Sequence, residues 1–458
     1  MPIVSTAGTD FRPESSYISS CLALAHEKLG HFASMADIAA HERQINRYSR
    51  LELLETPRRV LVLEDGAAAA RLNQAQAAVL RGEVLFEHAA AGEGTRLMLG
   101  PKYFLNLAQE LDIERLAHIL SQESGEEVTP EALGRSLECL PQELLPLPLG
   151  TRHMLQLAFD LSKLALELGE SPREVLGRQH LLLIISEEML AHLEKEFYQW
   201  HFFGFKPSQV YFMVQESFHG LSLKDGNFFY DRKSSRRLHN HGQMVMQQTQ
   251  EQQLFALAGD HPRVKTFCSR QAVVDWLRRF SDKISYNIED LDYLTDSIDF
   301  AGLGLALEAG RQGYNMVMEV VANNPLKPQK GGMLAWDPHL GRDVMVESFQ
   351  LGDIANQDIH YLNRNFNHYP QPCVSWRRLA ESGLPMPIAV KDGCLYFQPV
   401  QGDINFLVKT AFFRRRELRP IRSLKSPASL PLAINRMVAQ DSQPGFRDFV
   451  RRGLQGGL

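Results

Sequence analysis

Short apolar runs that alternate with longer amphipathic stretches most constrain the fold of this 458-residue chain. Helical stretches such as Met154–Leu168 and Glu187–Trp200 lie between runs that suit buried strands. The runs are Val84–Ala91, Leu181–Ile185, Val210–Val214, Met316–Val321, Val344–Ser348 and Ile388–Val390. Strands that alternate with helices favour an α/β fold with a mostly parallel sheet covered on both faces, whose ligands bind at the carboxyl ends of the strands.

The two ends of the chain differ from this middle part. Apolar residues at three-and-four spacing from about Ser16 to Leu80 predict a helical N-terminal segment. Past Gly402 a basic stretch and a polar tail predict a small C-terminal segment that folds back on the main domain. We therefore expect a helical segment over 1–79, a catalytic domain over 80–400 and a small segment over 401–458.

Charge and cysteine content exclude several classes of protein. The 49 basic and 54 acidic residues give a net charge of −5, so the chain has no basic field for nucleic acid or for a membrane surface. No run approaches the roughly 20 apolar residues that a membrane span needs. Odd in number and far apart, the cysteines indicate reduced thiols and a cytoplasmic location: Cys21, Cys139, Cys268, Cys373 and Cys394.

The loop AAGEGTRL, residues 90–97, directly follows a predicted strand. Its glycines, Gly92 and Gly94, allow backbone N–H groups to approach phosphate oxygens, and Arg96 and Lys102 would add positive charge. The alternative is a strand-to-helix turn in which the glycines serve only the bend. A dinucleotide fingerprint is excluded because Leu97 stands where GxGxxG needs its third glycine, and a P-loop is excluded because GK[ST] is missing.

This loop, followed by Pro101-Lys102, resembles the signature loop of the UDP-sugar pyrophosphorylases, which include the UDP-glucose and UDP-N-acetylglucosamine enzymes. Ala91 and Met98 depart from the family pattern. Further motifs match in the family's order over about residues 80 to 430, with weak identity between them. The resemblance implies a Rossmann-like nucleotidyltransferase domain that joins UTP to a sugar 1-phosphate and releases pyrophosphate.

Several substrate contacts follow from the resemblance. Gln215 ends the strand VYFMV and resembles the glutamine that reads uracil, while His241 and Gly242 in HNHG match a loop near the base and the sugar. The alternatives are a polar strand end and a surface loop. The remaining implied contacts are Gly92, Gly94 and Thr95 with the nucleotide, and Gly332, Glu347 and Asn365 with the sugar. These last three alternatively belong to a hairpin, an exposed strand and a turn.

The segment NIEDL, residues 287–291, resembles the NIDNL segment whose aspartate holds the metal ion. Here Glu289 replaces that aspartate and Asp290 follows it. Magnesium prefers hard carboxylate oxygens and leaves its other positions to phosphates and water. We expect Mg²⁺ at these two residues, with Glu289 favoured by the register of the match. The alternative is a solvated acidic loop.

Lys391 resembles the lysine that bridges the reacting phosphates, although it is alternatively an exposed lysine before a turn. The glucose branch is favoured because NIEDL, KGG (Lys330–Gly332) and ESFQL look most like it. The other readings are a UDP-N-acetylglucosamine pyrophosphorylase, a nucleotide-sugar-binding protein without catalysis, and a helical scaffold for a partner. The resemblance leaves the oligomeric state open.

Overall fold

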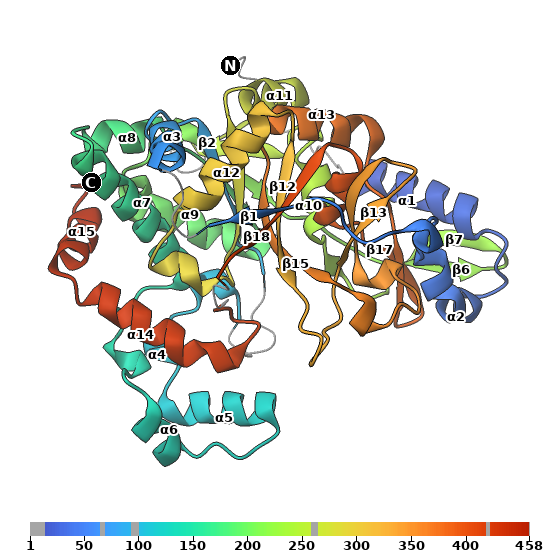
Figure 1. Ribbon diagram of the computed structural model, residues 1–458, viewed down its shortest axis with the longest axis horizontal. Coiled ribbons are helices and arrows are strands. Elements are labelled where there is room, and N and C mark those ends of the chain that lie inside the picture. The colour runs from blue at the N-terminus through green and yellow to red at the C-terminus, as the bar shows by residue number, and fades with distance from the viewer. Residues whose placement is uncertain (1–13, 65–68, 93–99, 258–263, 418–421, 458) are drawn as a thin grey trace.

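The computed structural model describes residues 14–64, 69–92, 100–257, 264–417 and 422–457. Its largest element is a mixed sheet with the order β1-β18-β12-β15-β11-β2-β3-β4-β9-β10 (Figure 1). The strands along this path are β1 (Val60–Leu63), β18 (Thr410–Arg415), β12 (Met316–Ala322), β15 (Tyr361–His368), β11 (Asp282–Asn287), β2 (Val84–Ala89), β3 (His180–Ile185), β4 (Val210–Val214), β9 (Leu254–Leu257) and β10 (Lys265–Phe267).

The centre of this sheet is parallel, as the sequence predicts. β11, β2, β3 and β4 pair in parallel, and so do β12, β18 and β1. β15 runs antiparallel between β11 and β12, and β9 and β10 extend the far edge antiparallel. Every residue of β3 is buried, because a central parallel strand is covered on both faces. The α/β fold class is therefore confirmed.

Two layers of helices cover the sheet. One face packs against α3 (Ala69–Leu80), α7 (Leu149–Glu167), α9 (Leu190–Gln199), α12 (Phe300–Arg311) and α15 (Pro444–Leu454). The other face packs against α10 (His241–Gln247), α11 (Arg270–Leu277) and α13 (Pro372–Ser382). α8 (Pro172–Arg178) lies beside α7.

A second, four-stranded sheet has the order β16-β17-β6-β7. Its strands are β16 (Ile388–Lys391), β17 (Cys394–Phe397), β6 (Leu221–Lys224) and β7 (Asn227–Tyr230). The N-terminal helices α1 (Glu14–Leu29) and α2 (Met35–Asn46) pack on it, at the right-hand end of Figure 1. Buried side chains such as Ala25 and Leu395 join the helices to this sheet.

Two expected strands pair only antiparallel, one in the small sheet and one at the side of the main sheet. Ile388–Val390 belongs to β16 of the small sheet, and Val344–Ser348 belongs to β14 (Arg342–Val346), which forms a hairpin with β13 (Met333–Asp337). β5 (Ser217–Phe218) and β8 (Arg237–Leu238) form one more antiparallel pair. Periodicity alone does not distinguish a parallel strand from an antiparallel hairpin strand, since both bury apolar side chains.

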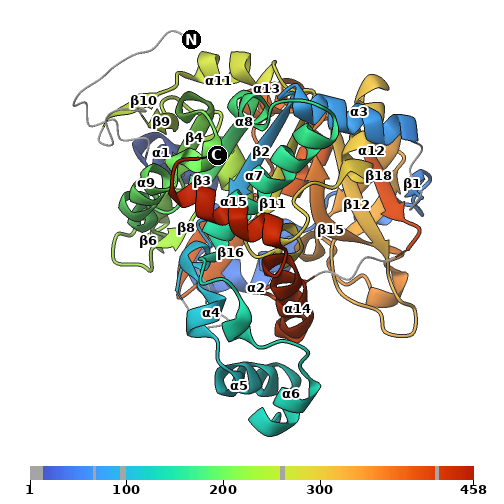
Figure 2. The same cartoon turned by 90° about the vertical axis from the view of Figure 1, so that its left-hand side faces the viewer.

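An arm of α4 (Leu107–Glu110), α5 (Ile113–Ser124) and α6 (Pro130–Ser136) projects from the sheet together with α14 (Leu430–Asp441), as Figures 1 and 2 show. A separate apolar cluster, including Leu116 and Ile434, holds the arm against α14. β1 and β18 take the main sheet beyond the expected limits of 80 and 400 at both ends. The domain boundaries themselves stay a prediction.

All five cysteines are free thiols. Within the described parts of the chain, each helix is too short or too polar to cross a lipid bilayer.

Candidate nucleotide and sugar site

Residues that the sequence singles out gather where parallel strands of the main sheet end. Gly92 lies shortly after β2, Gln215 directly after β4 and Glu289 two residues after β11. Parallel strands present their carboxyl ends at one edge of a sheet, and this edge is where α/β proteins bind ligands.

The two ends of the predicted phosphate loop meet at this edge. The Lys102 backbone N–H donates to the Gly92 carbonyl oxygen at 3.0 Å. A Cβ at Gly92 would lie 3.4 Å from Lys102 Nζ, so the lysine side chain runs back along the start of the loop. Gly94, Thr95 and Arg96, together with Met98, lie outside the described residues.

Lys102 joins a cluster of charges around Glu289. Lys102 Nζ lies 2.7 Å from Glu289 Oε2, with both side chains nearly buried, and Lys425 forms an ion pair with Glu289 Oε1 from the other side. Asn287 Nδ2 also donates to Glu289 Oε1, at 3.1 Å. Burial raises the pKa of Glu289, but hydrogen bonds from the two lysines outweigh burial and hold it below its usual value. Glu289 is therefore ionised at neutral pH and fixes two cations at one point.

The C-terminal segment brings Lys425 to this place. Leu424 N–H donates to the Glu289 carbonyl oxygen at 3.0 Å, and Leu291 N–H donates to the Arg422 carbonyl oxygen at 2.9 Å. The arm and α14 support this segment, since Ala428 N–H donates to Glu123 and Arg436 pairs with Asp292. The Lys425 side chain keeps 54% of its surface exposed, which leaves it open to a ligand.

Asp290 has different surroundings from Glu289. Asp290 N–H donates to the Asn287 carbonyl oxygen at 2.9 Å, so the chain turns here and the strict alternation of a strand no longer applies. Burial, and then the charge of Glu289, raise the pKa of Asp290 to about 7. In the part of the chain that the structure describes, its carboxylate accepts no hydrogen bond.

Glu289 and Asp290 stay the predicted ligands of a magnesium ion, although each oxygen of Glu289 already faces a lysine. Adjacent Glu289 and Asp290 offer hard oxygens, and Mg²⁺ needs only one or two such side chains because it keeps phosphate and water ligands. Burial and the charge of Glu289 outweigh Lys425 and Lys102, which lower the pKa of Asp290, so a further cation at Asp290 would favour its ionised form. The described residues contain no group of three or more histidine, cysteine or acidic side chains that could hold a metal by themselves.

Gln215 and the segment 239–243 form the side of the site where the base is expected. Gln215 Nε2 donates to the His239 carbonyl oxygen. His241 begins α10 and keeps an exposed surface, while the atoms packed around its ring and the nearby charge of Lys425 lower its pKa. A Cβ on Gly242 would lie 2.2 Å from the Pro399 carbonyl oxygen, so only glycine fits there.

Residues from three separate parts of the chain surround the Glu347 carboxylate. Asn363 Nδ2 donates to its Oε1 at 3.3 Å, and Cβ atoms at Gly332 and Gly402 would lie 3.4 and 2.9 Å from its carboxylate oxygens. Burial raises the pKa of Glu347, while the Asn363 hydrogen bond lowers it by less. Asn365 belongs to β15, where the register shifts between Met318 and Val320, but its side chain is outside the description.

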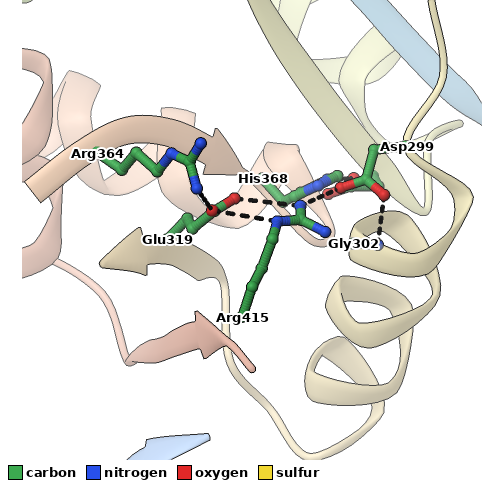
Figure 3. A network of polar contacts seen from close by, with 7 residues as sticks. Asp299, Gly302, Glu319, Arg364, His368 and Arg415 are labelled. Atoms are coloured by element: carbon green, nitrogen blue, oxygen red, sulfur yellow. Dashed lines mark hydrogen bonds and ion pairs between the residues drawn. The ribbon is translucent and has the colours of Figure 1, made fainter. Parts of the chain in front are cut away.

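A charge network on the opposite face anchors this irregular part of β15. Arg364 NH1 donates to Glu319 Oε1 at 2.7 Å, and Arg415 joins Glu319 to Asp299 at the start of α12 (Figure 3). On a strand, successive side chains point to opposite faces. Arg364 therefore holds β15 from one side while its neighbour Asn363 contacts Glu347 on the other.

Lys391 lies elsewhere. It is exposed at the end of β16, beside the turn at Asp392, which pairs with Arg237. Among the described contacts, none joins Lys391 to Lys102 or Glu289. The bridging role of Lys391 stays a prediction.

Three residues of the site are missing from the sequence-based set. Lys425 comes from a basic stretch with no motif, and Asn363 is two positions from the expected Asn365. Asp403 is fully buried next to Gly402, and neither of its carboxylate oxygens has a hydrogen-bond partner among the described residues. The sequence around a charged residue does not show whether it belongs to a site, because its contacts with distant residues depend on the tertiary fold.

No protein-family model and no curated protein sequence matches this chain. Solved structures do match. A uridine diphosphate N-acetylglucosamine pyrophosphorylase from Trypanosoma brucei in complex with inhibitor is 15% identical over 93% of this chain and 80% of its own, with a TM-score of 0.56. A variant of UDP-glucose pyrophosphorylase from Leishmania major in complex with UDP-glucose is 14% identical over 92% and 78%, with a TM-score of 0.50. At this identity the likeness shows the fold, which is that of these pyrophosphorylases.

Proposed function

We propose that this protein is a uridylyltransferase that transfers UMP from UTP to a sugar 1-phosphate, giving a UDP-sugar and pyrophosphate. The observation that carries the proposal is the cluster of Lys102, Glu289 and Lys425 at the carboxyl edge of the sheet. Two lysines held at one carboxylate, beside the predicted phosphate loop, suit a reaction between two anions.

In the proposed reaction a phosphate oxygen of the sugar 1-phosphate attacks the α-phosphorus of UTP in line. A new P–O bond forms, the bond to the β-phosphate oxygen breaks, and the electron pair leaves with pyrophosphate. Lys102 and Arg96 would neutralise the triphosphate, and the exposed Lys425 would bridge the two reacting phosphates. No covalent intermediate is required, because positioning and charge neutralisation supply the catalysis.

Glu289 and Asp290 would hold Mg²⁺, with Glu289 as the first ligand because it is ionised at neutral pH. When bound, the ion neutralises phosphate charge and orients the phosphate oxygens. Gln215 would form hydrogen bonds with the uracil. Gly242, which has no Cβ, would allow the backbone of residues 399–400 to lie close to the base site. Glu347 and Asn363 would accept and donate hydrogen bonds to sugar hydroxyls, with Gly332 beside them.

Glucose 1-phosphate is the sugar substrate we propose, since NIEDL, KGG and ESFQL resemble the glucose branch. The neighbour from Trypanosoma brucei favours N-acetylglucosamine 1-phosphate as the second candidate. A third, a nucleotide-sugar-binding protein without turnover, is motivated by Ala91, Met98 and Glu289 at motif positions.

One experiment separates these functions. Pyrophosphate release is measured with UTP, Mg²⁺ and a panel of sugar 1-phosphates, and UDP-glucose binding is titrated in parallel. Release that is greatest with glucose 1-phosphate supports the proposal. Binding without release supports the third candidate, and neither binding nor release contradicts all of them.

A further inference from the structure

Tyr17 on the N-terminal helix α1 reaches the segment 239–243 beside the proposed base site. Gln243 Nε2 donates a hydrogen bond to Tyr17 Oη. The Tyr17 ring lies 4.9 Å from the His239 ring and 5.6 Å from the Phe218 ring, measured between centroids. The N-terminal helix therefore contacts the proposed site through Tyr17, although it packs mainly on the small sheet.

The segment that Tyr17 touches is held by its own hydrogen bonds. Asn240 N–H donates to Gln243 Oε1 at 2.8 Å, and Gln243 N–H donates back to Asn240 Oδ1 at 3.0 Å, which forms a capping box for α10. Gln243 Nε2 also donates to the Phe397 carbonyl oxygen at 3.1 Å. Because Gln243 and His239 are buried, the Tyr17 hydroxyl and ring meet a rigid part of the segment.

This segment sets the orientation of the Gln215 amide. The Gln215 side-chain NH₂ donates to the His239 carbonyl oxygen, and a carbonyl oxygen can only accept. The amide nitrogen must therefore face His239, which turns Oε1 away from it. Gln215 N–H donates to the Ile185 carbonyl oxygen at 2.7 Å, so the backbone at this position is also fixed.

An amide in this orientation offers an acceptor to the base. Uracil carries a donor, N3–H, where cytosine carries an acceptor nitrogen. An Oε1 atom that faces this position would accept a hydrogen bond from uracil and would meet a lone pair of cytosine. When the wrong base is bound, a buried polar group of the site lacks its hydrogen-bond partner. This cost discriminates effectively between the two bases.

We propose that Tyr17 is a positioning residue that holds the segment 239–243 and, through the His239 carbonyl, the Gln215 amide in the orientation that prefers uracil to cytosine. The inference rests on the proposed function, because it assumes that the base lies at Gln215. It gives the N-terminal helix a part in nucleotide selection.

The test uses the full chain and measures UTP and CTP binding by calorimetry without a sugar phosphate. Tyr17→Phe keeps the ring contacts and loses the hydroxyl, whereas Tyr17→Leu loses both. We expect the UTP-to-CTP affinity ratio to fall by roughly tenfold in Tyr17→Leu and by less in Tyr17→Phe. In turnover, KM for UTP should rise while kcat changes little.

Tyr230→Phe is the matched control: Tyr230 lines the same small cavity as Tyr17, but its Oη accepts a hydrogen bond from the His219 N–H at 3.0 Å. The UTP-to-CTP affinity ratio of this variant should stay at the wild-type value. Thermal unfolding checks that each variant is folded.

The outcomes are distinct. If the wild type binds neither nucleotide, both the proposed function and this inference fail. If the wild type prefers UTP and the folded Tyr17 variants keep the same ratio, or lose affinity for both nucleotides equally, the function stands and the inference is wrong. Equal wild-type binding of UTP and CTP also overturns it.

Discussion

Lys102 Nζ lies 2.7 Å from Glu289 Oε2, which joins residues 187 positions apart in the sequence. The second cation at Glu289, Lys425, comes from still further along the chain. A carboxylate between two lysines stabilises each of them in a position that two phosphates could share. Because each of the three residues has a defined partner, single substitutions can test the proposed phosphate site.

Lys425→Ala should lower kcat by roughly 10²-fold or more, the scale for removing one preorganised charge donor. UTP binding should weaken less, because Lys102 remains. Lys391→Ala is the matched control, since Lys391 is exposed on the β16–β17 hairpin. Steady-state kinetics with both substrates decides the assignment. A large loss in Lys391→Ala with none in Lys425→Ala would return the bridging role to Lys391.

Glu289→Gln and Asp290→Asn should change the Mg²⁺ requirement unequally. We expect the Mg²⁺ concentration for half-maximal rate to rise more in Glu289→Gln, because this carboxylate is ionised and held in place by Lys102. A Mg²⁺ titration of each variant at fixed UTP measures it. A rise in Asp290→Asn alone would assign the metal to Asp290, and no rise in either would place the ion elsewhere.

The raised pKa of Asp290, about 7, predicts a pH-dependent stability. An aspartate has a pKa near 3.9 in the unfolded chain, so the folded state binds this proton more tightly. The contribution of Asp290 to stability is present in full below about pH 4 and is lost as the pH rises to about 7.

Asp290→Asn keeps the side chain neutral at every pH. The free energy of unfolding of the variant should therefore fall less between pH 5 and pH 8 than that of the wild type. Urea unfolding at the two pH values gives both differences, and the comparison with the wild type removes the other titrating groups. Identical pH dependence in the two proteins would show that Asp290 titrates normally.

Gly242→Ala should destabilise the protein by about 1–3 kcal/mol, the range for overpacking, because the new Cβ would lie 2.2 Å from the Pro399 carbonyl oxygen. Gly177→Ala is the control: Gly177 lies within the helix α8 and has open space around it, so alanine there should be neutral or stabilising. Thermal unfolding of both variants tests the packing. If Gly242→Ala unfolds like the wild type, α10 and residues 399–400 are not in tight contact.

The sequence predicts the parallel centre of the sheet well and the charged strands poorly. Val210–Val214 is β4 as expected, because a short apolar run between turn signals is typical of a buried strand. The strand β11, DKISYN, does not look like a buried strand. Its Lys283 is fully buried only because Glu87 of β2 lies 2.7 Å away, and its Asp282 because His368 of β15 pairs with it.

The same limit applies to the site. Lys102 and Glu289 belong to recognisable motifs, whereas Lys425 becomes a site residue only because residues 422–425 lie along 289–291. Lys391 is singled out in the sequence by the family resemblance alone, and the apolar run before it forms a strand of the small sheet. A sequence pattern shows local structure, while the meeting of distant charges depends on the complete fold.

Glu347 provides the last prediction, which concerns the sugar. Asn363 donates to its Oε1, and Gly332 and Gly402 leave no space for another side chain beside its carboxylate. In Glu347→Gln one acceptor oxygen becomes a donor NH₂ of nearly the same shape, so hydroxyl groups lose a partner while the volume of the side chain hardly changes. KM for the sugar 1-phosphate should rise by roughly tenfold or more, the scale for a lost hydrogen bond to a charged group, while KM for UTP stays within about twofold.

Asn363→Asp is the companion variant, since it would place a second carboxylate against Glu347 and should weaken sugar binding as well. Initial rates with one substrate varied and the other saturating separate the two KM values. An equal rise for UTP and the sugar phosphate would mean that Glu347 supports the fold of the whole site and does not read the sugar.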